Sequence, residues 1–76
     1  MQLSKQGSKE SLIAARKKFE AALILWQKLE YEEFQATTLS SIGEIYYYLG
    51  ENQKALQFLN LALPLYRAVG DRDQEA

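Results

Sequence analysis

ATTLSSIGEIYYYLGENQKALQFLNLALPLYRAVG, residues 36–70, is the stretch that decides the fold of this chain. Before Gly50 the apolar side chains recur every three or four residues, at Leu39, Ile42, Ile45, Tyr46 and Leu49. After Gly50 the same spacing continues at Ala55, Leu59, Ala62, Leu63, Tyr66 and Val69. This spacing puts each set on one face of an α-helix. Because Gly50 can adopt the left-handed conformation that ends a helix, the stretch predicts two helices joined by a short turn.

A third amphipathic segment precedes this hairpin, with apolar residues at Leu12, Ala15, Phe19, Ala22, Leu23, Trp26 and Leu29. We therefore expect helices at about residues 8–29, 31–49 and 52–69. Gly70 is expected to end the third helix, and residues 71–76 to begin a fourth. Short links make successive helices antiparallel, so the predicted fold class is all-α, built from helical hairpins.

The composition excludes several classes of function. The 76 residues carry nine basic and ten acidic side chains, which gives a net charge of −1, and they include no cysteine or histidine. A near-neutral chain lacks the excess positive charge that phosphate contacts need, so we expect no nucleic acid partner. Disulfides and the usual cysteine or histidine metal sites are excluded, so hydrophobic packing must stabilise the fold.

No membrane contact and no catalysis are expected. The longest apolar run, residues 21–26, is far shorter than the roughly 20 residues that span a bilayer. Because residues 1–10 contain no signal-like apolar segment, we expect a cytoplasmic location. Phosphate-binding glycine loops and activated nucleophiles are absent from the sequence, and its carboxylates cluster at predicted helix starts. We therefore predict no enzyme, no cofactor and no metal.

The first and third predicted helices are related by an internal repeat. A shift of 40 residues superposes alanine on alanine or leucine on leucine at five positions: Ala15 on Ala55, Ala22 on Ala62, Leu23 on Leu63, Leu25 on Leu65 and Ala36 on Ala76. Large apolar residues also correspond: Phe19 with Leu59, Trp26 with Tyr66 and Leu29 with Val69. One repeat cannot bury its apolar face alone, so we expect the chain to be a segment of a longer array.

The hairpin resembles a known repeat family. Its large and small positions look like the tetratricopeptide repeat signature: Leu39, Ile42, Gly43, Tyr46, Ala55, Leu59 and Ala62. Residues 36–43 and 62–72 also resemble the 40-residue tandem repeats abundant in cyanobacteria, many of which are joined to a caspase-like CHAT protease domain. The resemblance implies a right-handed α-solenoid that acts as a non-enzymatic scaffold for protein or peptide partners.

In this family the first helix of each pair lines the concave surface, which here corresponds to the predicted helix over residues 31–49. Helical spacing gathers five of its side chains opposite the apolar stripe: Thr37, Ser40, Glu44, Tyr47 and Tyr48. These residues form the predicted protein-binding face. The alternative is that Tyr47 and Tyr48 pack against an adjacent repeat. Because this face has no cation, we predict no clamp for a partner's C-terminal carboxylate.

A second apolar stripe, Phe58, Leu61 and Leu65, lies on the third predicted helix. We expect it to contact the next repeat or a second copy of the chain, which would make the isolated chain a homo-oligomer. A purely structural role in an array is therefore the main alternative to ligand binding. A sensor role in a CHAT-type signalling protease is a further alternative that the resemblance implies.

Gly43 lies in the middle of a predicted helix, where glycine costs up to about 1 kcal/mol relative to alanine. We therefore expect a close approach between two helices at this position.

Overall fold

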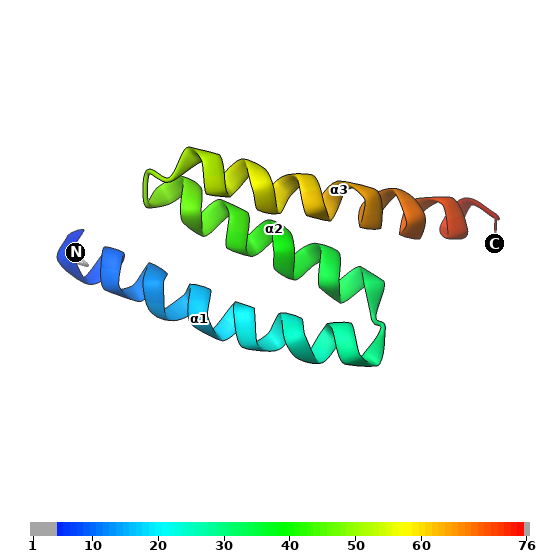
Figure 1. Cartoon of the computed structure of the whole chain (residues 1–76), viewed down its shortest axis with the longest axis horizontal. Helices are drawn as coiled ribbons and strands as arrows, with labels where there is room; N and C mark the ends of the chain where they lie inside the picture. Colours follow the sequence, from blue (N-terminus) through cyan, green and yellow to red (C-terminus); the bar gives the residue numbers. More distant parts are fainter. Residues whose placement is uncertain (1–4, 76) are drawn as a thin grey trace.

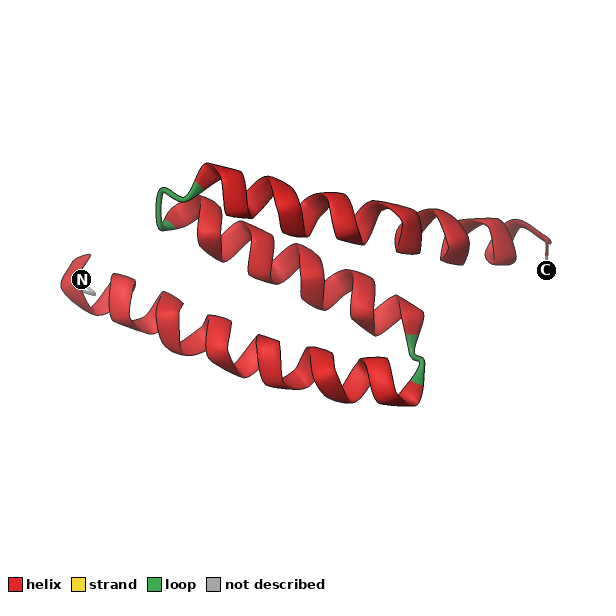
Figure 2. Cartoon of the chain, in the orientation of Figure 1, coloured by secondary structure: helices red, strands yellow, loops and turns green. Residues whose placement is uncertain are grey.

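The computed structural model describes the backbone of residues 5–75 and the side chains of residues 9–71. It contains three helices: α1 (Lys5–Leu29), α2 (Glu32–Tyr48) and α3 (Asn52–Glu75). Figure 2 shows no strand in this described part. The helices run antiparallel in chain order, and α2 lies between α1 and α3 (Figure 1). The predicted all-α fold of helical hairpins is confirmed.

The core is centred on α2, because only this helix is covered on two sides. Ile42 is completely buried and forms a cluster with Tyr46 and with Ala55 of α3. Leu23 of α1 and Phe58 of α3 pack against this cluster. Most of the described buried residues belong to α2: Ala36, Thr38, Leu39, Ile42, Gly43, Ile45 and Tyr46. The middle helix therefore holds its two neighbours together.

Both links between helices use the same hydrogen-bonded turn. At the first link, Tyr31 donates to the carbonyl of Trp26, and Glu30 donates to that of Gln27. At the second link, Glu51 donates to Tyr46, and Gly50 donates to Tyr47. This is the Schellman pattern, which needs a left-handed residue after the helix. Gly50 has φ 84°, and Glu30 takes the same role with φ 59°.

The strain at Glu30 is offset by an aromatic cluster at the same corner. Left-handed φ costs a residue other than glycine roughly 1 kcal/mol or more. Trp26 lies 6.0 Å from Tyr31 and 4.9 Å from Phe34 between ring centroids. These ring contacts on either side of Glu30 hold α1 against the start of α2.

The end of the third helix differs from the expectation. α3 continues through Gly70 to Glu75, so Gly70 does not end it and residues 71–75 do not start a fourth helix. Ala76, also predicted to lie in that fourth helix, is outside the described residues. Glycine permits a left-handed turn but does not require one. In the 40-residue register, the residues corresponding to Tyr31 and Phe34 are Asp71 and Gln74, so the sequence offers no aromatic pair to stabilise a corner.

The remaining helix ends lie close to the predicted ones. α1 begins three residues before residue 8, and α2 begins and ends one residue inside the predicted range of 31–49.

The helices α2 and α3 approach each other closely at Gly43. A Cβ atom at this position would lie 3.0 Å from Leu59 Cγ and 3.2 Å from the carbonyl oxygen of Ala55. The leucine could shift, but the backbone oxygen belongs to the opposing helix. The missing side chain therefore allows the two helices to pack closely, as the sequence predicts.

Replacing Gly43 with leucine should lower the free energy of unfolding by about 1–3 kcal/mol, because the added side chain overpacks the contact between α2 and α3. Urea unfolding followed by circular dichroism measures the change. Gly70→Ala is the matched control: its Cβ would meet nothing within 4 Å, and it should stabilise the helix by up to about 1 kcal/mol. Unchanged stability in the Gly43→Leu variant would contradict the close approach.

Candidate functional site

Two tyrosines at the C-terminal end of α2 are the most exposed large hydrophobic side chains among the described residues. Tyr47 is 63% exposed and Tyr48 67% exposed. Their ring centroids lie 5.6 Å apart with the rings edge to face. Tyrosine combines a large apolar ring with a hydrogen-bonding hydroxyl, and it is enriched in binding hot spots. An exposed pair of this kind is suited to contact with another molecule.

These tyrosines form one wall of a groove between α2 and α3. The turn at Gly50 folds α3 back beside α2, so that residues on both sides of the turn face the same space. The groove has a volume of about 510 Å³. It is lined from α2 by Glu44, Tyr47 and Tyr48, and from α3 by Asn52, Ala55, Leu56 and Leu59. We call this the tyrosine groove.

The tyrosine groove has mainly apolar walls with few polar groups. Leu56 is 59% exposed, and Leu59 also contributes exposed apolar surface. Glu44 is the one charged residue of the lining, and Asn52 supplies an amide. A groove of this kind can bind an apolar segment and orient it through a few polar contacts.

The structure unites three of the five residues predicted for the contact face. Glu44, Tyr47 and Tyr48 line the tyrosine groove, whereas Thr37 and Ser40 do not. The hydroxyl of Thr37 donates to the carbonyl oxygen of Glu33 one turn earlier. Ser40 donates to the hydroxyl of Tyr66 across the interface between α2 and α3, at 3.2 Å. Thr37 lies in the N-terminal half of α2 and Ser40 at its middle, away from the groove at its C-terminal end.

The three residues of the predicted second stripe do not share one environment. Phe58 stacks on Tyr46 with ring centroids 5.5 Å apart and packs against the core cluster. Leu65 is half-buried, and Leu61 is 56% exposed. Phe58 is therefore partly buried against the hydrophobic core, and of the three only Leu61 is freely exposed.

The apolar residues that are exposed along α3 form a different row from the predicted second stripe. It consists of residues spaced three or four apart, Leu56, Leu59, Leu63 and Tyr66, all of which are exposed. The sequence puts Leu59, Leu63 and Tyr66 on one apolar face of the helix together with Ala55 and Ala62. The two alanines are buried and Leu59 contacts α2 at Gly43, whereas Leu63 is 47% and Tyr66 43% exposed. The helix has apolar residues on two adjacent faces, and the periodicity alone does not tell which face α2 covers. Leu56, which lines the groove, was missed for this reason.

A fixed ion pair lies away from the groove, on α1. Arg16 donates to Glu20 at 2.9 Å, one turn along the helix. This hydrogen bond raises the pKa of the Arg16 guanidinium above its ordinary value, at which arginine is already a cation in proteins.

Two kinds of site are not found in the described part of the chain. The described residues contain no group of histidine, cysteine, aspartate or glutamate side chains arranged to hold a metal ion. None of the described helices is long and apolar enough to span a membrane.

Residues 8–68 match the tetratricopeptide repeat family. The chain belongs to this family. The matched segment includes most of α1, all of α2 and the larger part of α3, so it contains the whole tyrosine groove. Repeats of this family generally mediate protein–protein interactions. Comparison with curated proteins and with solved structures gave no match.

Phe58→Ala should lower the free energy of unfolding by about 2 kcal/mol or more, because it removes a ring that stacks on Tyr46 in the core. Leu61→Ala should change it by no more than about 0.5 kcal/mol, since that side chain is exposed. Chemical unfolding of the two variants beside the unchanged repeat protein gives both values. Equal effects at the two positions would contradict this assignment of the faces of α3.

Proposed function

We propose that this tetratricopeptide repeat chain is a protein-interaction module whose tyrosine groove binds an apolar segment of a partner protein. The observation that carries the proposal is the convergence of Tyr47, Tyr48 and Leu56 on one groove between two helices. The family supports a protein or peptide as the partner, and the groove suggests which part of the molecule receives it.

The lining of the groove favours a partner with a particular pattern. Leucine and tyrosine side chains bury apolar surface when a partner covers them, which contributes about 25 cal/mol per Å². Glu44 adds a negative charge to the lining. A lysine or arginine of the partner would pair with it, and such a pair contributes mainly to specificity and register. We therefore expect a partner segment with apolar residues next to a cation.

A library of random peptides displayed on phage tests this binding without a choice of partner in advance. The unchanged chain should enrich peptides with large apolar residues beside lysine or arginine. Leu56→Lys and Tyr48→Ser should each lower the affinity of the selected peptides at least tenfold. Both positions are exposed, so the fold should be retained, and circular dichroism checks this.

Leu61→Lys is the matched control for that selection. Leu61 is about as exposed as Leu56 but lies roughly 140° away around α3, outside the groove lining. This variant should bind the selected peptides as the unchanged chain does. Selection of no consensus, or equal loss in all three variants, would contradict the proposal.

A second candidate function is self-association, as a structural segment of an array. The 40-residue register supports it. Leu23 of α1 packs against the core cluster of α2, and its counterpart in α3 is Leu63, which is exposed. Trp26 packs on Phe34 of α2, and its counterpart is the exposed Tyr66. The face of α3 that carries Leu63 and Tyr66 therefore matches the face of α1 that already binds a helix.

Light scattering across a concentration series tests self-association. If the chain associates through this face, its mass should rise with concentration towards twice that of the 8.7 kDa monomer. A Leu56→Glu, Leu63→Glu double variant should stay monomeric, and Leu61→Glu should behave as the unchanged chain. A monomer at all concentrations would exclude this candidate. Phe58, part of the predicted second stripe, is unsuitable for the test because it packs in the core.

The remaining proposals concern a neighbouring protease domain, the cellular location and the excluded classes of partner. A sensor role in a CHAT-type signalling protease rests on the resemblance of residues 36–43 and 62–72, and a CHAT domain encoded in the same reading frame would support it. The cytoplasmic location and the absence of nucleic acid or membrane partners rest on composition and remain predictions.

A further inference from the structure

A second cleft lies between α1 and the turn that joins α2 to α3, and it has a different chemical character. Its volume is about 280 Å³. The lining comes from all three helices and the turn: Lys9, Ile13, Arg16, Tyr46, Leu49, Glu51 and Lys54. Three of the seven residues are cations, each from a separate turn of helix. In a chain with net charge −1, this is a local concentration of positive charge. We call it the basic cleft.

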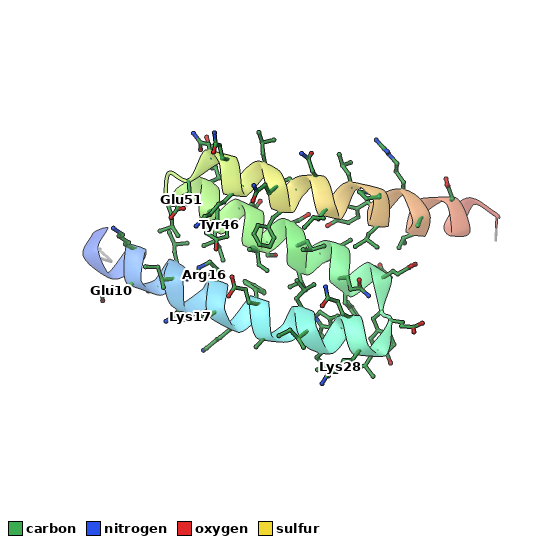
Figure 3. All side chains as sticks on the ribbon, in the orientation of Figure 1. Glu10, Arg16, Lys17, Lys28, Tyr46 and Glu51 are labelled. Carbon is green, nitrogen blue, oxygen red and sulfur yellow. The ribbon has the colours of Figure 1, made fainter. Side chains whose placement is uncertain are left out.

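Two of the cations are held at the ring of Tyr46. The guanidinium carbon of Arg16 and the amino nitrogen of Lys54 each lie 5.5 Å from the centroid of that ring. The distance between the guanidinium carbon of Arg16 and the amino nitrogen of Lys54 therefore cannot exceed the sum of these two distances. Phe58 stacks on the same ring, which fixes the ring in the core. Figure 3 shows Arg16 extending from α1 towards Tyr46, with Glu51 at the turn beside it. The cations are positioned by α1 and α3 on a rigid aromatic support.

The charges around the cleft do not balance. Arg16 pairs with Glu20 at 2.9 Å, and Lys54 pairs with Glu51 at 3.4 Å. Lys9 has no ion pair with any side chain that the structure describes. Three cations and two carboxylates leave one positive charge, so a single negative charge would neutralise the group. Arg16 uses one nitrogen, Nη1, for Glu20, so its other N–H groups can donate to a further acceptor.

We propose that the basic cleft binds an aspartate or glutamate side chain of a partner protein. This proposal rests on the proposed function as a protein-interaction module, and it adds a second contact of opposite charge to the tyrosine groove. The carboxylate would accept hydrogen bonds from Arg16 and lie between Lys9 and Lys54. A carboxylate carries the one negative charge that the cleft lacks, whereas a phosphate monoester carries up to about two. The apolar walls, Ile13 and Leu49, leave room for the methylene groups of an acidic side chain.

The test uses the complete chain and a short capped peptide, acetyl-Gly-Glu-Asp-Glu-Gly-amide. Amide resonances are followed by NMR while the peptide is added at low salt. We expect saturable shifts confined to the residues around Arg16, Leu49 and Lys54, and weaker binding at physiological salt, because charge pairs at the surface are screened. The isosteric peptide acetyl-Gly-Gln-Asn-Gln-Gly-amide should produce no such shifts. Diffuse shifts, or equal shifts with the neutral peptide, would overturn the proposal.

Charge-removing variants locate the contact. Arg16→Gln and Lys9→Gln should each weaken binding of the acidic peptide at least fivefold. Lys9→Gln breaks no ion pair among the described side chains, so it tests the cleft even if Arg16→Gln disturbs α1. Lys17→Gln and Lys28→Gln are the controls, because both side chains point away from α2 in Figure 3 and neither lines the cleft. Equal loss in the control variants would mean a nonspecific charge effect and would also overturn the proposal.

Two further measurements separate the outcomes. Inorganic phosphate at the same concentration should bind at least fivefold more weakly than the acidic peptide, and stronger binding of phosphate would replace the carboxylate assignment. Leu56→Lys, which alters the tyrosine groove, should leave the shifts around Arg16 unchanged. If the tyrosine groove selects no peptides while the acidic peptide still binds at the basic cleft, the proposed function of the groove is refuted and the proposal for the basic cleft stands.

Discussion

The close contact between α2 and α3 at Gly43 is the constraint on which the rest of the structure depends. Leu59 and the carbonyl oxygen of Ala55 occupy the space that a side chain at this position would fill. The approach brings Ala55 against Ile42 and Tyr46 and allows Phe58 to stack on Tyr46. It also sets the distance between the two walls of the tyrosine groove. A small residue in the middle of one helix thus determines both the core and the exposed surface beside it.

The sequence predicts the order and type of the three helices because those depend on local pattern, but the fourth helix expected from residue 71 is instead a continuation of α3. Apolar spacing marks each helix, and Gly50 marks the tight turn between α2 and α3. The first corner is less visible, since Glu30 takes the left-handed conformation without being a glycine. The support for this corner is tertiary: Trp26, before Glu30, packs on Tyr31 and Phe34, after it. Gly70 shows the reverse case: a suitable residue is present, but the sequence has Asp71 and Gln74 where the first corner has Tyr31 and Phe34, and the helix continues.

The candidate site was predictable on α2 and not on α3. Glu44, Tyr47 and Tyr48 lie opposite a single clear apolar stripe, so helical geometry assigns them to the exposed side. α3 is apolar on two adjacent faces, and alanine at positions 55 and 62 contributes less to the pattern than the larger leucines do. Yet the small residues mark the side that α2 covers, because close packing requires them there. The buried alanines therefore indicate the covered face of α3 more clearly than the larger side chains at its edges do.

The single tryptophan gives the molecule a built-in optical probe. Trp26 is half-buried where α1 meets the start of α2, and it contacts no described aromatic ring of α3. Its fluorescence therefore senses whether α1 is docked, while far-ultraviolet circular dichroism senses all three helices together. If the two signals change at different denaturant concentrations, α1 separates from the α2–α3 hairpin before the hairpin melts. The cooperativity of this small repeat protein can thus be resolved without any added label.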